Sequence, residues 1–265
     1  MPSKPQGATP LLIDALQFSN PSRDRFIEWR DGNVGCVHVT IAIWENARET
    51  LSTIGKWNRL LEENADLIAL ATSAEQIEEI VASGRTAVLY GFQDTSPLED
   101  DIELVEIFHQ LGVRIVQLTY NVQNRIAAGC WEDDDIGVSG FFGKNVIREM
   151  NRLGMLVDIS HCNARSSLDA VEISERPVAI THANPSAFVG TDIELNRRNK
   201  STDLIKLCAE RGGVIGLSNY PKILKNGSNC TLESFIDMID WTVQLIGPDH
   251  VGLGTDFYDG WPVSE

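Results

Sequence analysis

Short apolar runs of strand length alternate with amphipathic helical patterns along this chain of 265 residues. Such alternation is the signature of strand-helix-strand units, which build a parallel sheet. Eight of the runs predict the strands of a closed barrel, and they cover residues 11–15, 35–42, 86–92, 114–118, 155–160, 178–182, 213–217 and 250–255. A further run at 67–71 predicts an additional short strand before the third barrel strand.

The segments between these runs carry apolar residues three or four positions apart, which is the spacing of a helix with one buried face. They predict helices at 48–63, 73–83, 100–111, 142–153, 166–174, 203–211 and 232–246. The fold class expected is therefore α/β, a (β/α)8 TIM barrel in one domain over residues 1–265. Such barrels place a helix after every strand. Because little chain follows the eighth run, either the barrel is left open at one side or the chain is a fragment of a longer polypeptide. We expect the fragment, a barrel truncated after strand eight.

The composition of the chain limits the classes of molecule that it is expected to bind. Lys and Arg number 22 against 38 Asp and Glu, so the formal net charge is −16. An acidic chain disfavours binding to nucleic acid and to anionic membranes, and no apolar stretch has the roughly 18 residues of a membrane span. The five cysteines contain no C-x-x-C pair, which argues against a disulfide framework or a zinc knuckle. We expect a cytoplasmic protein with a small-molecule partner, and a homodimer is left open.

Three polar side chains stand at the ends of apolar runs. His161 and His182 end the fifth and sixth predicted strands, and Asp256 ends the eighth. In a TIM barrel the carboxyl ends of the strands meet at one face, where catalytic and metal-binding groups gather. A single histidine at a buried strand end is more often a hydrogen-bonded core residue. Two histidines with an acid predict a site, because imidazole and carboxylate are common zinc ligands.

Several motifs carry a resemblance to a known family. They include Val-Asp-Ile-Ser-His at 157–161 and Gly-Leu-Gly-Thr-Asp at 252–256, together with 117–121, 180–184, 197–199 and 212–216. In order and spacing they resemble the membrane (renal) dipeptidase family, a branch of the metal-dependent amidohydrolase superfamily. The resemblance implies a TIM-barrel hydrolase that holds two zinc ions at the top of the barrel.

Part of the family's ligand set is present. His161 and His182 match the two histidines that bind one ion. Asp256 matches the aspartate that binds the other ion and acts as the base. The resemblance therefore implies metal-ligand roles for all three residues and a catalytic role for Asp256.

Three other ligands of the family are replaced. Its first strand ends in Asp-Gly-His-Asn-Asp, whereas this chain has Leu16 and Phe18 at the positions of the histidine and the second aspartate. Its bridging glutamate aligns with Gln93. Since zinc normally needs three or four protein ligands, a second ion would be held by little more than Asp256. We therefore expect at most one divalent ion, zinc, bound by the two histidines with Gln93 and Asp256 completing the ligands.

Two further positions match substrate-binding residues of the family. Arg198 matches an arginine that pairs with the substrate carboxylate, for which a planar guanidinium is well suited. Tyr120 stands where the family has a histidine that stabilises the oxyanion, and a phenol can donate the same hydrogen bond. The alternatives are a surface arginine and a packing aromatic. The resemblance thus implies a substrate-binding role for both and a catalytic role for Tyr120.

Two functions are consistent with this pattern. The first is a metal-dependent hydrolase of the dipeptidase type, which cleaves an amide or peptide bond in a small carboxylate-bearing substrate at a mononuclear site. The alternative is a catalytically inactive barrel that binds a small ligand or partner, as the three replaced ligands suggest. A fold alone does not distinguish these two functions, so the choice between them depends on the side chains of the site.

Overall fold

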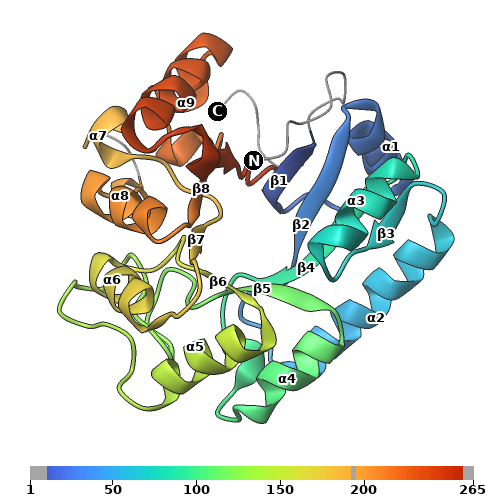
Figure 1. The fold of residues 1–265 in the computed structure, drawn as a ribbon, viewed down its shortest axis with the longest axis horizontal. Coiled ribbons are helices and arrows are strands. Elements are labelled where there is room, and N and C mark those ends of the chain that lie inside the picture. Colours follow the sequence, from blue (N-terminus) through green and yellow to red (C-terminus); the bar gives the residue numbers. More distant parts are fainter. Residues whose placement is uncertain (1–10, 192–194, 259–265) are drawn as a thin grey trace.

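The computed structural model describes residues 11–191 and 195–258, and within them eight parallel strands close into a barrel (Figure 1). Hydrogen-bonded neighbours run in the order β2-β1-β9-β8-β7-β6-β5-β4, and pairing of β2 with β4 closes the ring. The barrel strands are β1 (Leu12–Gln17), β2 (Val34–Ala42), β4 (Thr86–Phe92), β5 (Val113–Gln117), β6 (Leu156–Asp158), β7 (Ala179–Ile180), β8 (Val214–Leu217) and β9 (Val251–Leu253). The TIM-barrel prediction is confirmed.

The additional strand predicted before the third barrel strand is also present. It is β3 (Ile68–Leu70), and it pairs in parallel with the first residues of β4. The last residues of β4 pair with β5 instead. Strand β3 therefore lies outside the barrel, beside the first residues of β4.

Helices surround the barrel (Figure 1). Each of the seven predicted helices is found, and they are α2 (Ala47–Glu63), α3 (Ala74–Ala82), α4 (Glu103–Gln110), α5 (Phe142–Leu153), α6 (Ala164–Ile173), α8 (Thr202–Glu210) and α9 (Leu232–Ile246). Two more, α1 (Arg23–Asp31) and α7 (Ser186–Val189), were not predicted. Most of α1 is charged, and only Phe26 and Trp29 are buried, so its helical period is barely visible in the sequence.

Side chains that accept hydrogen bonds from the first turn begin several of these helices. Asn46 and Glu49 form a reciprocal capping box at α2. Asn163 accepts from the amide of Ser166 at α6. Because Asn163 follows His161 by two residues, this cap fixes where the chain leaves the strand end and enters the helix.

The apolar core lies between the strands and their helices. Phe92 of β4 meets Phe108 of α4 edge to face at 5.0 Å between ring centroids, and Trp57 of α2 meets Tyr90 of β4 at 6.2 Å. Such aromatic contacts add to the free energy gained by burying their surfaces. This packing holds the ring rigid, which is what a site on the strand ends requires.

Buried polar groups of the strands also bond to one another. The Asp14 carboxylate of β1 accepts from the amide of Thr255 at 2.8 Å and from its hydroxyl at 2.6 Å. Gln17 donates to the same carboxylate at 2.6 Å. Strand β1 pairs with β9 through a single residue pair, Asp14 with Leu253. The carboxylate therefore supplies much of the bonding between the first and last strands.

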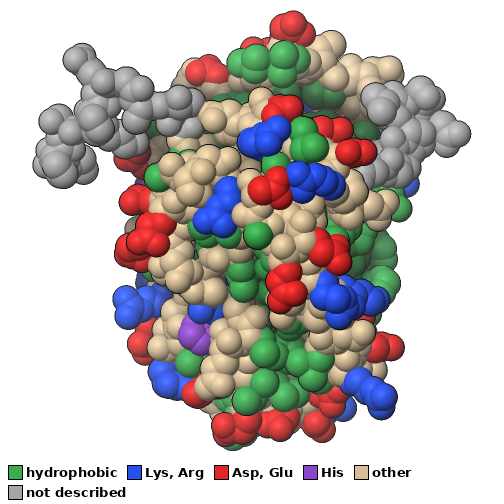
Figure 2. Space-filling view, turned by 90° about the vertical axis from the view of Figure 1, so that its right-hand side faces the viewer, with side chains coloured by type: hydrophobic (Ala, Val, Ile, Leu, Met, Phe, Trp, Pro, Cys, Tyr) green, Lys and Arg blue, Asp and Glu red, His purple; other side chains and the backbone are tan. Residues whose placement is uncertain are grey.

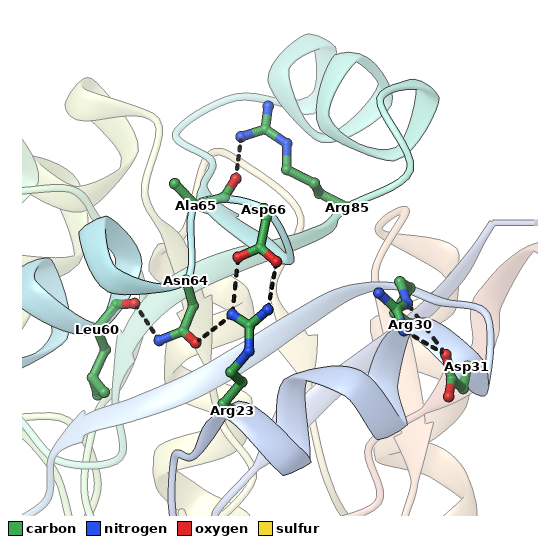
Figure 3. A network of polar contacts seen from close by, with 8 residues as sticks. All are labelled: Arg23, Arg30, Asp31, Leu60, Asn64, Ala65, Asp66 and Arg85. Atoms are coloured by element: carbon green, nitrogen blue, oxygen red, sulfur yellow. Dashed lines mark hydrogen bonds and ion pairs between the residues drawn. The ribbon is translucent and has the colours of Figure 1, made fainter.

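Away from the strand ends, polar contacts of the surface tie helices to loops. Arg23, the first residue of α1, donates to both carboxylate oxygens of Asp66 at 3.0 and 2.6 Å and to Asn64 at 3.2 Å (Figure 3). Since both charged side chains are more than half exposed, the pair adds little stability but fixes the start of α1. Acidic and basic side chains are interspersed over the face seen in Figure 2, so its charge is mixed rather than of one sign.

Close backbone contact at the end of β9 generates a prediction. A Cβ on Gly254 would lie 1.7 Å from the Thr181 carbonyl oxygen, whereas a Cβ on Gly252 would meet nothing nearer than 4.0 Å. We expect Gly254→Ala to lower the free energy of unfolding by at least ~2 kcal/mol, because the Thr181–His182 backbone must move. Gly252→Ala, on the same strand, should change it by less than ~1 kcal/mol. Urea denaturation measures both values, and equal stabilities would contradict the predicted contact.

Candidate active site

The two histidines predicted as ligands face each other. His161 follows β6 by three residues and His182 follows β7 by two, and both side chains are buried. Their Nε2 atoms lie 2.9 Å apart. Neighbouring strands of a barrel thus bring together two residues that are 21 positions apart in the sequence.

Each ring is fixed at its other nitrogen. His161 Nδ1 lies 2.6 Å from Asn121 Oδ1, and His182 Nδ1 lies 2.7 Å from Thr181 Oγ1. The Thr181 hydroxyl donates its proton to Asp158 at 2.6 Å, so its oxygen accepts from His182 Nδ1. Asn121 Oδ1 likewise accepts from His161 Nδ1. Both Nε2 atoms consequently present lone pairs to the same point.

The surroundings keep both rings neutral. Burial lowers the pKa of His161 and of His182 well below the usual value, and the Arg198 guanidinium lowers both further. The buried ammonium of Lys200 acts in the same direction. At neutral pH neither ring therefore carries a second proton, and the bonds made by the two Nδ1 atoms place the one proton of each ring away from the other ring.

A cavity of about 370 Å³ opens beside this pair. Five of the six predicted site residues line it: Gln93, Tyr120, His161, Arg198 and Asp256. The sixth, His182, does not line the cavity but contacts His161. The remaining lining residues are Phe18, Ile43, Asn121, Trp131, Leu195, Tyr220, Lys222 and Tyr258.

Gln93 and Asp256 both line the cavity and both carry side-chain oxygen atoms. The Gln93 amide nitrogen donates to Thr40 at 2.7 Å, so the carbonyl oxygen is the end that can bind a cation. Asp256 has a positive φ of 56°, and its amide bonds to the Leu16 carbonyl at 3.0 Å. Burial raises the pKa of Asp256 to about 7, although Arg198 opposes the rise.

Tyr120 stacks on His161, with ring centroids 4.2 Å apart and planes 22° apart. Trp44 contacts the other side of Tyr120 edge to face at 5.3 Å. Burial raises the pKa of the Tyr120 phenol, so it stays protonated and able to donate a hydrogen bond. The ring therefore packs against a histidine and lines the cavity at the same time.

Arg198 is buried although it is an arginine, with 2% of its surface exposed. One terminal nitrogen donates to the Ser160 carbonyl and the other to the His182 carbonyl, the latter at 3.0 Å. The guanidinium thereby bridges the backbone at the two histidine-bearing strand ends. Because it has five N–H donors, others remain for a ligand in the cavity.

The positions that replace family ligands on β1 are apolar here. Leu16 is fully buried, and Phe18 packs on Tyr258 at 5.6 Å between ring centroids. No carboxylate or imidazole from these positions reaches the cavity. These two positions therefore present apolar surface and offer no side-chain ligand for a metal ion.

The histidine pair, in contrast, has the chemistry of a metal site. Two imidazole nitrogens on one tetrahedral zinc are separated by roughly 3.3 Å, close to the 2.9 Å found here. A bonded Nδ1–H on each ring is also the usual arrangement of histidine ligands. Within the described residues, however, no group of three or more His, Cys, Asp or Glu side chains is gathered for an ion. Gln93 and Asp256, which line the same cavity as His161, are the side chains available as further ligands, together with water.

Comparison with known proteins identifies the family of this chain. The sequence model of the membrane dipeptidase family, peptidase family M19, matches residues 14–265. The chain belongs to the membrane dipeptidase family. The resemblance inferred from the motifs is thus confirmed.

Curated relatives include dipeptidase tcpJ of Claviceps purpurea, 32% identical over 81% of this chain, and an uncharacterized dipeptidase of Schizosaccharomyces pombe, also 32% identical over 81%. The chain spans about half the length of either relative. Among solved structures, an amidohydrolase of Pseudomonas aeruginosa has a TM-score of 0.89 and 35% identity, over 95% of this chain and 75% of that one.

A metallo peptidase of Rhodobacter sphaeroides, liganded with a phosphinate mimic of the dipeptide L-Ala-D-Ala, has a TM-score of 0.83 at 17% identity. The alignment covers 94% of this chain and 86% of that one, and it shows a shared fold. Within residues 11–191 and 195–258 of this chain, no helix is long and apolar enough to cross a membrane.

Sequence reasoning missed the residues that orient the histidines. Asn121 has a positive φ of 66°, which asparagine tolerates better than most residues, and it follows Tyr120 directly. Asp158 is an acid inside an apolar run, and such a placement signals a buried hydrogen-bonding role. Both signals were present, but the partner of each residue lies on another strand.

The bridging role of Arg198 generates a second prediction. Arg198→Ala should lower the free energy of unfolding by at least ~2 kcal/mol, because two buried carbonyl groups lose their donors. Arg197→Ala is the matched control. Its side chain is mostly exposed, and we expect a change of ~0.5 kcal/mol or less. Urea denaturation of both variants measures the difference, and an Arg198→Ala protein as stable as wild type would contradict a bridging role.

Proposed function

We propose that this protein is a hydrolase of the dipeptidase type, which cleaves an amide bond in a small substrate that carries a carboxylate. The observation that carries the proposal is the pair of imidazole lone pairs, directed at one point beside a cavity that also contains Asp256 and Arg198. Membership of the membrane dipeptidase family supports the same reaction class.

The proposed cofactor is one divalent ion, zinc, with His161 and His182 as its ligands and Gln93 and Asp256 completing the set. Neutral imidazoles and a carbonyl oxygen suit a single zinc ion. When bound, the ion supplies Lewis acidity that polarises the scissile carbonyl. The apolar side chains of Leu16 and Phe18 favour one ion over two.

Asp256 is the proposed general base. Water attacks the carbonyl carbon while its proton passes to the Asp256 carboxylate. The C–N bond then breaks, and the proton passes from Asp256 to the leaving amine, so that the carboxylate is regenerated. Position supports this role, because Asp256 lines the cavity from the β9 end while the histidines approach from β6 and β7.

Two other residues bind the substrate in this proposal. Arg198 pairs with the substrate carboxylate through the N–H groups that its backbone contacts leave over. Tyr120 donates its phenol proton in a hydrogen bond to the oxygen on which negative charge develops. The stack on His161 supports this, because it holds the phenol ring beside the metal-binding nitrogen.

The second candidate function is a barrel that binds a small ligand without turnover. It is favoured by one observation, the replacement of family ligands by Leu16 and Phe18. For both candidate functions we propose that the protein lies in a reducing compartment such as the cytoplasm. Its five free cysteines support this location. A small molecule is the proposed partner in both cases.

Metal content tests the ion. Purified protein dialysed against zinc should retain about one ion per chain, because the histidine pair has no counterpart on the apolar side of the site. His161→Ala should retain less than a tenth of that amount, and His109→Ala, on helix α4, should retain it fully. Elemental analysis gives the stoichiometry. Two ions per wild-type chain would refute the mononuclear site.

Kinetics test the base. Asp256→Asn keeps the shape of the side chain but removes its ability to accept a proton, so kcat should fall by at least ~10²-fold while KM changes little. Asp249→Asn, at an exposed position just before β9, should match wild type. The assay is release of amine from a panel of dipeptides and N-acyl amino acids. Full activity of Asp256→Asn would remove the proposed base, and an inactive wild type would favour the ligand-binding barrel.

A further inference from the structure

A chain of hydrogen bonds leads from a buried carboxylate to His182. Asp158, the last residue of β6, accepts from the Thr181 hydroxyl at 2.6 Å, and Thr181 Oγ1 lies 2.7 Å from His182 Nδ1. All three side chains are at most 2% exposed. Water therefore has little access to replace any of these bonds.

Counting protons fixes the direction of each bond. Asp158 Oδ1 accepts from the amide of Ser160 at 2.9 Å, from its hydroxyl at 2.6 Å and from the amide of Thr181 at 3.2 Å. Among the described residues, Asp158 Oδ2 accepts from the Thr181 hydroxyl alone. Both hydroxyls donate to this carboxyl group, so the single hydroxyl proton of Thr181 is committed to Asp158 at 2.6 Å and not to Ser160 Oγ, which lies 3.1 Å away.

We propose that Asp158 is a positioning residue, which acts through Thr181 to hold His182 in the Nδ1–H tautomer with its Nε2 lone pair facing His161. Asp158 is not among the residues that line the cavity, and it reaches the His182 imidazole through the Thr181 hydroxyl rather than directly. Its relevance to zinc rests on the proposed function. Its effect on the tautomer is measurable in the metal-free protein.

The same arrangement occurs a second time in the barrel. The Asp14 carboxylate accepts from the amide and the hydroxyl of Thr255, at 2.8 and 2.6 Å. Thr255 is followed by Asp256, which has no ring nitrogen for the threonine to orient. Asp14→Asn therefore removes an equivalent buried carboxylate without touching the chain to His182, and it serves as the matched control.

Asp158→Asn is the main test. The amide should place its oxygen at the Oδ1 position, where three donors converge, and its NH2 at the Oδ2 position against Thr181. Thr181 Oγ1 then accepts from this amide, so its own proton becomes available to the nearer of two acceptors, His182 Nδ1 at 2.7 Å rather than Ser160 Oγ at 3.1 Å. We expect His182 to change to the Nε2–H tautomer, in which the nitrogen facing His161 carries a proton. Zinc affinity should fall roughly 10–100-fold.

Selective ¹⁵N labelling of the five histidines allows the tautomers to be read by NMR at pH 7.5 after chelator treatment. Zinc affinity is measured by competition with a chromogenic chelator. Thr181→Val breaks the chain without altering Asp158 and should also weaken zinc binding, whereas Thr181→Ser should restore it. Asp14→Asn should leave the His182 tautomer as in wild type.

Retention of the Nδ1–H tautomer in folded Asp158→Asn would overturn the proposal. So would zinc affinities of Asp158→Asn and Thr181→Val within twofold of a wild type that binds zinc, or a tautomer change in Asp14→Asn. If Asp158→Asn does not fold, the contrast between Thr181→Val and Thr181→Ser decides in the same way. A tautomer change in a protein whose wild type binds no zinc would support the hydrogen-bond chain while removing the proposed ion.

Discussion

Hydrogen bonds to two buried carboxylates hold the ends of the barrel strands. Asp14 joins β1 to β9 and Asp158 joins β6 to β7, and each accepts from both the amide and the hydroxyl of a threonine on the neighbouring strand. The residue after each threonine is a predicted site residue, Asp256 or His182. Burying a carboxylate is costly unless donors surround it, so loss of any of these donors destabilises the strand ends. The site is therefore only as ordered as the two carboxylate–threonine pairs beneath it.

The site combines retained and altered halves. On the β6 and β7 side, two imidazoles, their bonded Nδ1 atoms and a bridging arginine form a complete hydrogen-bonded unit. On the β1 side, Leu16 and Phe18 stand where the family motif has a histidine and an aspartate, and the Asp14 carboxylate bonds to Thr255. An aromatic pair of Phe18 and Tyr258 lines this side. One half thus suits a cation, and the other suits an apolar part of a ligand.

Much of this was predictable from the sequence. Strands and helices leave periodic patterns, so the barrel order and the facing of His161 and His182 followed from strand ends alone. Helix α1 was not predicted, because only two of its residues are buried and they leave little periodic pattern. The orienting roles of Asn121 and Thr181 were also not predicted, since a hydrogen bond between strands depends on register and ring orientation, which no local pattern encodes. The backbone contacts of Arg198 were hidden for the same reason.

The double duty of Arg198 limits how this site can diversify. Its guanidinium spans the carbonyl groups of Ser160 and His182, so any replacement loosens the strand ends that carry the histidines. Substitution of Arg198 to change ligand preference would therefore also destabilise the site. Trp131 and Tyr220 line the same cavity but lie in loops. Substitutions at such loop residues can therefore alter the cavity while the Arg198 contacts beneath the histidines stay intact.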